Sequence, residues 1–252
     1  MSPSDLSVGS QQQDGRAVAA WRAMMKAMRI DKETAAALVR VIEHKDCATA
    51  AHTWRVVLYT RALAEAVGIS HEEEQRLTFA AALHDIGKID ISEEILGKPG
   101  PLTDAEFAVM KTHAALGHQA LVSMGEDDPI LLNLVRHHHE RFDGLGYPDG
   151  LAGEAIPLVA RWFAVIDSFD AMTSVRPYRS QVGEEAARRA VVELQAGMGT
   201  RYAPEPVVAF ADLYHTGQLD WILHYFNDEV PTSGWEAERV EVARKVRSRP
   251  GA

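Results

Sequence analysis

The pattern of apolar and polar positions predicts helices throughout the chain. In residues 52–67 the apolar positions include Val56, Leu63 and Val67, and Gly68 follows at a position where glycine commonly ends a helix. No segment of useful length alternates between apolar and polar residues with the period of two that marks a strand, and no internal repeat is present. The chain is therefore predicted to be all-α.

Two capping boxes mark the starts of further helices. Ser70 with Glu73 predicts a helix that runs to His84 or Asp85, and Thr103 with Glu106 predicts one that runs through residue 124. Glycines and prolines predict loops at 97–101 and 143–157, the second an ordered loop without a regular element. The other predicted helices are one or two within 16–45, and single helices at 130–139, 158–172, 184–196 and 204–214.

The predicted domain organisation has one large central unit with short extensions. Residues 1–15 are polar and predict a disordered tail, and residues 16–45 predict an N-terminal helical extension. The central domain is expected to span residues 46–212. Residues 213–252 predict a C-terminal helical extension or tail, whose last 25 residues interleave Glu and Arg.

Composition narrows the function classes. The 252 residues are 46% hydrophobic and 25% charged, as in a folded globular protein, and the net charge of −10 argues against long nucleic acid as a partner. The net charge does not argue against small anionic substrates, because a local cluster of cationic side chains can bind them. The single cysteine, Cys47, excludes an internal disulfide and a Cys-rich zinc site. No segment has the apolar length of a signal peptide or a membrane span, so we expect a cytoplasmic protein without a membrane partner.

The eleven histidines are the candidate metal-binding residues, although each one alone has an ordinary structural explanation. His84 next to Asp85 offers two different metal ligands, although a histidine near a helix end is also common. In the run 137–139, successive helical residues point about 100° apart, so two neighbours can each reach one of two ions while the third lies in solvent or behind the site. His113 is expected in mid-helix, and His118 is expected to be structural because it lies on another face.

Carboxylates at the end of an apolar helix add to this inventory. Asp167 follows an apolar run, where a buried carboxylate needs a cation or a metal ion, and Asp170 shares its face and can orient a ligand or meet a cation. The alternative to a role at a metal ion is a structural ion pair between one of these carboxylates and Arg176 or Arg179. Together these nitrogen and oxygen donors suit a two-ion site for iron or manganese that works on a phosphoryl group. The candidate metal ligands are His52, His84, Asp85, His113, His138, His139 and Asp167.

The order of the motifs resembles the HD-GYP family of HD-superfamily phosphohydrolases. The resemblance rests first on His84-Asp-Ile-Gly-Lys88 and on His138-His-Glu-Arg-Phe-Asp-Gly-Leu-Gly-Tyr-Pro148. It continues through Met110-Lys-Thr-His113, through Ala160-Arg-Trp-Phe-Ala-Val-Ile-Asp167 and through the segment 170–179, and it covers about residues 46–212.

The resemblance implies a helical bundle that hydrolyses cyclic di-GMP to linear pGpG, to GMP or to both. It implies the seven metal ligands above, with Asp85 bridging two ions, and a catalytic role for Asp85 and Lys88. Lys88, Asp170, Arg176 and Arg179 are expected to contact the dinucleotide. The loop at Gly146-Tyr-Pro148 is expected to shape the rim of the site and to contact signalling proteins such as diguanylate cyclases, and a homodimer is a further expectation.

Two departures from the family pattern affect the expectations. Members with three metal ions have a glutamate four residues before the first histidine ligand, where this chain has Ala48. We therefore expect two ions. The family often has Phe-Asp-Pro where this chain has Tyr202-Ala203-Pro204, so a helix cap worth about 1 kcal/mol is expected to be missing.

Three alternatives stay open. One is a catalytically weak sensor or scaffold that binds a cyclic dinucleotide, although the complete ligand set argues against it. Another is a hydrolase of a different cyclic dinucleotide or of a simple nucleotide. The third is a di-iron oxygenase, which the Gly-Tyr-Pro loop does not favour.

Overall fold

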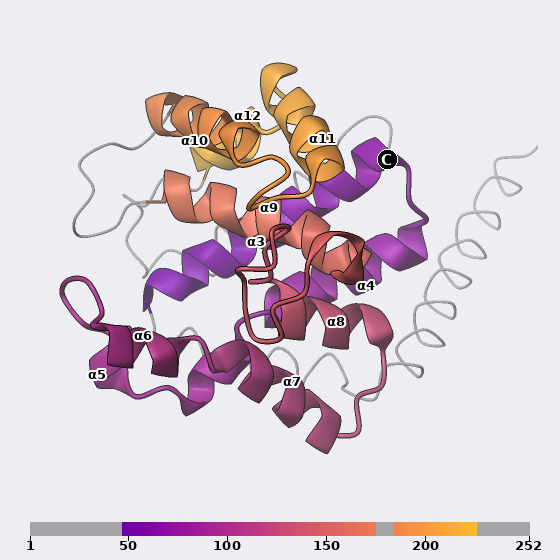
Figure 1. The fold of residues 1–252 in the computed structure, drawn as a ribbon. Coiled ribbons are helices and arrows are strands. Elements are labelled where there is room, and N and C mark those ends of the chain that lie inside the picture. The colour runs from indigo at the N-terminus through magenta and orange to yellow at the C-terminus, as the bar shows by residue number, and fades with distance from the viewer. Residues whose placement is uncertain (1–46, 175–183, 226–252) are drawn as a thin grey trace, which may run out of the picture.

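The computed structural model describes residues 47–174 and 184–225, and these residues confirm the all-α prediction (Figure 1). Two short 3-10 helices, η1 (Ile86–Asp90) and η2 (Gly153–Ala155), accompany the α-helices, and no strand occurs in the described ranges. The α-helices are α3 (Cys47–Val67), α4 (His71–Leu83), α5 (Glu93–Leu96), α6 (Asp104–Met110), α7 (His113–Ser123), α8 (Pro129–His137), α9 (Leu158–Thr173), α10 (Glu184–Ala196), α11 (Pro204–His215) and α12 (Asp220–Tyr225).

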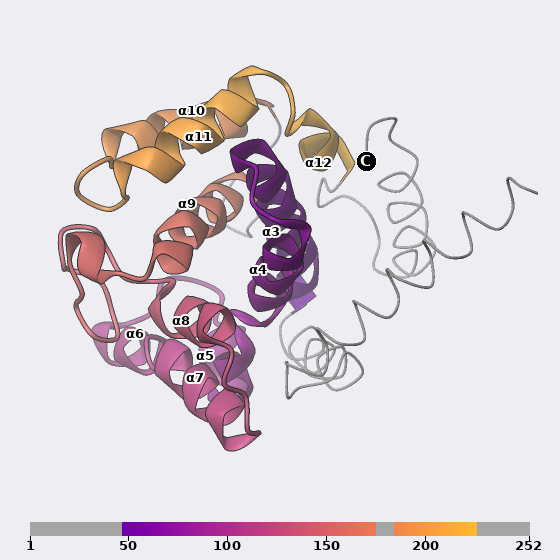
Figure 2. The same cartoon turned by 90° about the vertical axis from the view of Figure 1, so that its right-hand side faces the viewer.

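Helices α3 and α9 lie at the centre of the molecule. Figures 1 and 2 show α10, α11 and α12 on one side of them and α5 to α8 on the other. Tyr59 of α3, Phe169 of α9 and Phe210 of α11 are fully buried and meet edge to face, with ring centroids 4.9–5.9 Å apart. The core continues past residue 212, the expected domain end, because Leu219 and Ile222 also belong to it.

The predicted helix starts and ends are largely confirmed. Gly68 follows α3 with a φ of 72°, a conformation that glycine adopts without strain. Both capping boxes form, at Ser70 with Glu73 and at Thr103 with Glu106. At the start of α11, Ala203 occupies the N-cap position and its side chain makes no capping hydrogen bond, as its identity predicts.

The single helix predicted from residue 104 through residue 124 is wrong, because α6 and α7 are separate helices. They are broken at Lys111 and Thr112, where the Thr112 hydroxyl donates to the carbonyl of Val109 at 2.7 Å. A threonine hydroxyl that bonds to nearby backbone competes with regular helix formation. His113 consequently stands at the first turn of α7 instead of in mid-helix. The loop 143–157 is also more regular than predicted, because it contains η2.

Several expectations fall on residues that lie outside the described ranges. These are the tail 1–15, the helices within 16–45, the final 25 residues, and the substrate contacts of Arg176 and Arg179. Among the described residues, no helix combines the length and the apolar character that crossing a membrane requires.

Asp128 is expected to be important for stability because it performs two functions at the start of α8. It caps the helix by accepting from the amide of Ile130 at 2.8 Å, and Arg76 donates to it twice at 2.7 Å. We expect Asp128→Ala to lower the free energy of unfolding by about 2–3 kcal/mol, measured by urea denaturation. Asp128→Asn keeps a cap acceptor and should lose less. A loss below about 0.5 kcal/mol in Asp128→Ala would contradict this reading.

Candidate metal centre

Seven predicted ligands come from five separate parts of the fold. His52 lies on α3, Asp167 lies on α9, and His84 and Asp85 follow the end of α4. His113 begins α7, and the pair His138 and His139 follows α8. Because these helices pack against one another, side chains that are distant in sequence meet at one place. The structure thus brings the predicted set together.

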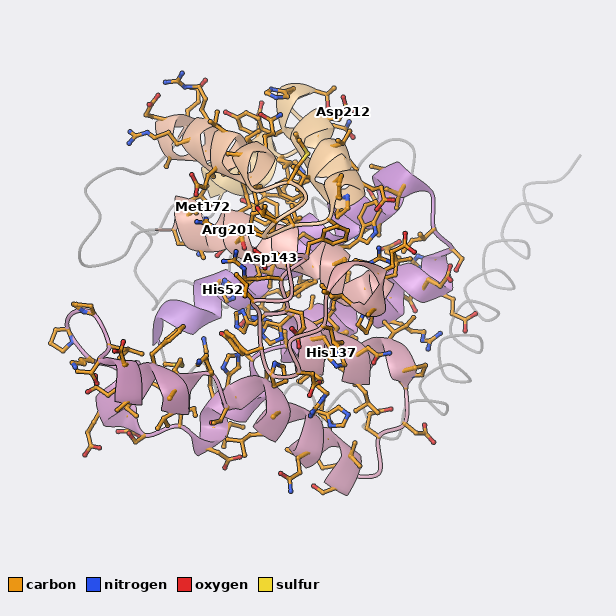
Figure 3. The ribbon with its side chains drawn as sticks, viewed as in Figure 1. His52, His137, Asp143, Met172, Arg201 and Asp212 are labelled. Carbon is orange, nitrogen blue, oxygen red and sulfur yellow. The ribbon has the colours of Figure 1, made fainter. Side chains whose placement is uncertain are left out.

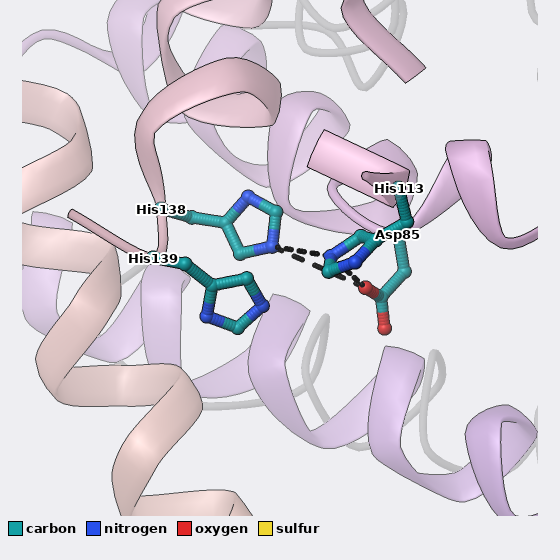
Figure 4. Close-up of side chains that lie close together, drawn as sticks. All are labelled: Asp85, His113, His138 and His139. Carbon is teal, nitrogen blue, oxygen red and sulfur yellow. Dashed lines mark hydrogen bonds and ion pairs between the residues drawn. The ribbon is translucent and has the colours of Figure 1, made fainter. Parts of the chain in front are cut away.

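One group of potential ligands contains Asp85, His113, His138 and His139, with donor atoms within 4.8 Å of one another. Figure 4 shows His138 and His113 pointing toward the Asp85 carboxylate. Asp85 Oδ1 lies 3.3 Å from His113 Nε2 and 4.0 Å from His138 Nε2. His138 and His139 can share this group because α8 ends at His137 and the chain leaves the helix there.

A second group contains His52, His84 and, again, Asp85. Asp85 Oδ2 lies 3.2 Å from His84 Nε2 and 4.0 Å from His52 Nε2. Asp167 adds a carboxylate on this side, with Oδ1 3.5 Å from His52 Nε2. The two oxygens of Asp85 therefore face two different sets of imidazoles, which is the arrangement of a carboxylate that joins two cation positions.

The backbone fixes which ring nitrogen each histidine presents. The Nδ1 atoms of His84 and His113 lie 2.8 and 2.7 Å from the carbonyls of Ala81 and Met110, and His138 Nδ1 lies 3.0 Å from the carbonyl of Val135. A carbonyl only accepts, so each Nδ1 must carry the proton. In the neutral rings Nε2 is then a bare acceptor that faces the centre, as in metal-binding histidines.

These bare nitrogens fit a cation between them. His113 Nε2 and His138 Nε2 are 3.3 Å apart, and His52 Nε2 and His84 Nε2 are 3.2 Å apart. Two acceptors at such distances repel each other unless a proton or a metal ion lies between them. Imidazoles mixed with carboxylates, and no thiolate, form a donor set that suits Fe, Mn or catalytic Zn.

Burial and neighbouring charges together set the protonation states of the buried groups. Burial lowers the pKa of His138 well below its ordinary value and that of His139 to about 4, so both rings are neutral at pH 7. Burial alone would raise the pKa of Asp85, but His84, Lys88 and His113 outweigh it and hold the carboxylate ionised. Burial likewise opposes a charge on His52, yet Asp170, Asp167 and Asp85 raise its pKa.

The third histidine of the run lies outside the centre. His137 Nε2 pairs with Asp149 at 3.1 Å, and its Nδ1 lies 3.1 Å from the carbonyl of Asn133. Figure 3 labels His137 and His52 at separate places in the molecule. His137 is therefore the member of the run that belongs to neither group of potential ligands. His118, which was expected to be structural, belongs to neither ligand group.

Gly87 lets two parts of the centre approach each other. A Cβ at this position would lie 1.9 Å from the carbonyl oxygen of His113 and 2.5 Å from the amide nitrogen of Gly117. The 3-10 helix that follows Asp85 is thus in backbone contact with α7, which carries His113. Only glycine permits this contact, so Gly87 sets the separation between Asp85 and His113.

The two described residues predicted to contact substrate have different positions. Lys88 Nζ pairs with Asp85 Oδ2 at 2.6 Å, and its side chain is 20% exposed, so it lies at the edge of the centre. Asp170 is 0% exposed and accepts from His52 and Arg55. A direct substrate contact by Asp170 is therefore wrong, because the side chain presents no surface. Its partner is Arg55, a residue that the sequence analysis missed.

The loop after His139 is held by a buried carboxylate. Glu140 is 3% exposed and accepts from three backbone amides, those of Asp149 at 2.8 Å and of Gly150 and Leu151 at 3.1 Å. The ring of Tyr147 lies against the ring of His139, with centroids 4.8 Å apart. Glu140 thus ties the loop 143–157 to the segment that carries two candidate ligands.

Glu140→Ala is expected to loosen this loop without unfolding the protein. The three amides lose their acceptor, so we expect their hydrogen exchange to accelerate about 10- to 100-fold, measured by mass spectrometry on peptides that cover 149–151. Exchange in α9 serves as the internal control and should not change. Unchanged exchange in the loop would show that Glu140 does not hold it.

Comparison with known proteins places the chain in a family. Residues 36–205 match the family model described as "HD domain". The chain is 42% identical over 78% of its length to the cyclic di-GMP phosphodiesterase response regulator RpfG of Xanthomonas campestris pv. campestris, of which the match covers 51%. It is 36% identical over 66% of its length to the 3'3'-cGAMP-specific phosphodiesterase 3 of Vibrio cholerae, of which the match covers 35%.

A solved structure shares the fold. Bd1817, an HDG"Y"P protein from Bdellovibrio bacteriovorus, matches with a TM-score of 0.52 and 20% identity over 65% of this chain and 51% of Bd1817. The chain belongs to the HD-domain family. The family model and the similarity to curated cyclic di-GMP phosphodiesterases confirm the resemblance identified from the motifs. The matched region spans about a third to a half of the curated relatives.

Proposed function

We propose that the chain is a metal-dependent phosphodiesterase that opens cyclic di-GMP. The observation that carries this proposal is the position of Asp85, whose two carboxylate oxygens face two separate groups of imidazoles. A carboxylate in that position could be shared by two divalent ions, which would supply the chemistry that cleaves a phosphodiester. The similarity to RpfG, which is named a cyclic di-GMP phosphodiesterase, supports the same substrate class.

Two divalent ions would be held by seven side chains. Asp85, His113, His138 and His139 would hold one ion, and His52, His84, Asp85 and Asp167 would hold the other. When bound, the ions supply Lewis acidity and a water-derived nucleophile at neutral pH. The chain's contribution is to direct the Nε2 atoms of His84, His113 and His138 at the centre, to keep Asp85 ionised and to pack the buried ring of Phe163 against His84, with centroids 4.9 Å apart.

Lys88 is proposed to stabilise the phosphate. Its ammonium group is already at the centre through Asp85, and a small movement toward substrate would place a positive charge near a non-bridging oxygen. Arg176 and Arg179 are proposed to bind the second phosphate or the bases, a role inferred from the family motif. The loop that contains Leu145, a 77% exposed apolar side chain, is proposed to contact signalling proteins such as diguanylate cyclases.

Iron is the proposed metal and manganese the alternative, because both accept mixed histidine and carboxylate ligands. Two ions are proposed in place of three because Ala48 has no carboxylate to hold a third. The proposed products are linear pGpG, GMP or both. A second candidate substrate is 3'3'-cGAMP, favoured by the similarity to the Vibrio enzyme, although that similarity is lower than the similarity to RpfG.

A substrate comparison tests the proposal. The purified chain, loaded with Mn(II), is given cyclic di-GMP and 3'3'-cGAMP in separate reactions, and kcat/KM is measured by chromatography of the products. A higher kcat/KM for cyclic di-GMP is the expected result. A higher value for 3'3'-cGAMP would transfer the assignment to that substrate, and tight binding without cleavage of either would favour a sensor.

A further inference from the structure

A buried ion pair lies directly behind the centre. Arg55 on α3 is 4% exposed, and Asp170 on α9 is 0% exposed. Arg55 Nε donates to Asp170 Oδ1 at 2.5 Å, and Arg55 Nη2 donates to Asp170 Oδ2 at 3.1 Å. Two parallel bonds between a guanidinium and a carboxylate fix the plane of both groups. The pair also joins the two central helices of the fold.

The same carboxylate reaches one histidine of the centre. Asp170 Oδ2 lies 2.8 Å from His52 Nδ1, which donates to it. The ring of His52 is thereby held with Nε2 directed at His84 Nε2, 3.2 Å away, and at Asp167 Oδ1, 3.5 Å away. Ser174 closes the arrangement, since its hydroxyl lies 2.6 Å from Arg55 Nη2 and 2.9 Å from Asp170 Oδ2.

Among the described histidines of the two ligand groups, His52 is the one whose outer nitrogen bonds to a side chain. His84, His113 and His138 use carbonyls on or beside their own helices, at a sequence separation of three or four residues. His52 depends on a residue 118 positions away. Its orientation is therefore set by the packing of α3 against α9, and Asp170 cannot hold it correctly unless Arg55 holds Asp170.

We propose that Arg55 is a positioning residue that acts through Asp170 to aim His52 Nε2 at the second ion position. The inference rests on the proposed function only in requiring that the two ligand groups bind divalent ions. A histidine whose outer nitrogen bonds to a carboxylate is fixed in one tautomer and is a stronger ligand, and loss of such a partner costs about 10- to 100-fold in metal affinity. The other group, around His113, makes no use of Asp170.

We predict that loss of Asp170 weakens the binding of one divalent ion and leaves the binding of the other unchanged. Co(II) is titrated into the full metal-free chain without oxygen, and visible absorption and calorimetry give the number of ions and the two affinities. Wild type is expected to bind two Co(II). In Asp170→Ala one of the two affinities should fall about 10- to 100-fold while the other stays unchanged. Asp170→Asn should lie between the two, because its amide oxygen can accept from His52 Nδ1.

Arg55 is tested directly and against a matched pair. Arg55→Met should reduce the same single affinity, and Arg55→Met/Asp170→Ala, which leaves no unpaired buried charge, keeps the test available if a single variant fails to fold. Asp128→Ala is the matched control, because it also breaks an ion pair joined by two hydrogen bonds, that of Arg76 with Asp128. Neither residue belongs to the ligand groups, so both Co(II) affinities should stay unchanged.

The outcomes separate this inference from the proposed function. Two wild-type affinities in Arg55→Met would overturn the positioning role of Arg55, as would an equal fall of both affinities in either variant. Such results would leave the phosphodiesterase proposal standing. A wild-type chain that binds no Co(II) would overturn both.

Discussion

His138→Ala is expected to lose cyclic di-GMP hydrolysis by at least about 1,000-fold, whereas His137→Ala keeps it within about threefold. Loss of an outer partner of a ligand already costs about 10- to 100-fold, so loss of a ligand costs more. His138 is buried with Nε2 3.3 Å from His113 Nε2. His137 instead bonds Asp149, which Arg136 still holds with two bonds when the imidazole is removed.

The comparison is sharp because the two variants remove the same side chain at adjacent positions. Initial rates with Mn(II) and the metal content of each purified variant are measured, and circular dichroism checks that both remain folded. Equal activities would contradict the assignment of His138. A fall in His137→Ala alone would mean that the wrong member of the run had been placed in the centre.

Gly87→Ala is expected to be nearly as damaging, although the residue has no side chain to bind anything. The new Cβ would lie 1.9 Å from the carbonyl oxygen of His113, so η1 and α7 must separate. A shift of about 1 Å at a reacting centre costs about 100-fold in rate, and forced repacking of a tight contact costs about 1–3 kcal/mol of stability. We expect both losses, measured by initial rates and by urea denaturation.

Gly97→Ala is the matched control for this variant. Gly97 has a φ of −90°, and its added Cβ would meet only the carbonyl oxygen of Glu93, at 3.2 Å. Activity in Gly97→Ala should remain within about threefold of wild type. If Gly87→Ala were as active as Gly97→Ala, the close approach of η1 to α7 would not set the geometry of the centre.

The sequence predicted those features that depend on neighbouring residues. Gly68 and the two capping boxes define helix ends by local hydrogen bonding and backbone conformation, so their positions were readable. The ligand set was recognised because its members stand in motifs of fixed order. The break at Thr112 was missed because one threonine is a weak signal within an otherwise helical segment.

Features that depend on helix packing could not be predicted in this way. Asp170 was assigned to substrate because its position on the helix face of Asp167 was visible, whereas its burial against Arg55 depends on how α3 meets α9. The signal for Arg55 was a charged residue within the apolar stretch Trp54-Arg-Val-Val57, three residues after His52. Such a residue in a central helix needs a buried partner, although sequence alone does not identify it.

The most direct test of the central claim is metal-dependent cleavage of cyclic di-GMP. Protein purified without oxygen is loaded with Fe(II) or Mn(II), given cyclic di-GMP, and the products are resolved by chromatography, with His84→Ala/Asp85→Ala as the control. We predict that the wild-type chain forms pGpG or GMP only when metal is present, and that the double variant forms neither. Unchanged cyclic di-GMP in the presence of wild-type protein with two bound ions, or equal cleavage by the double variant, would contradict the proposed function.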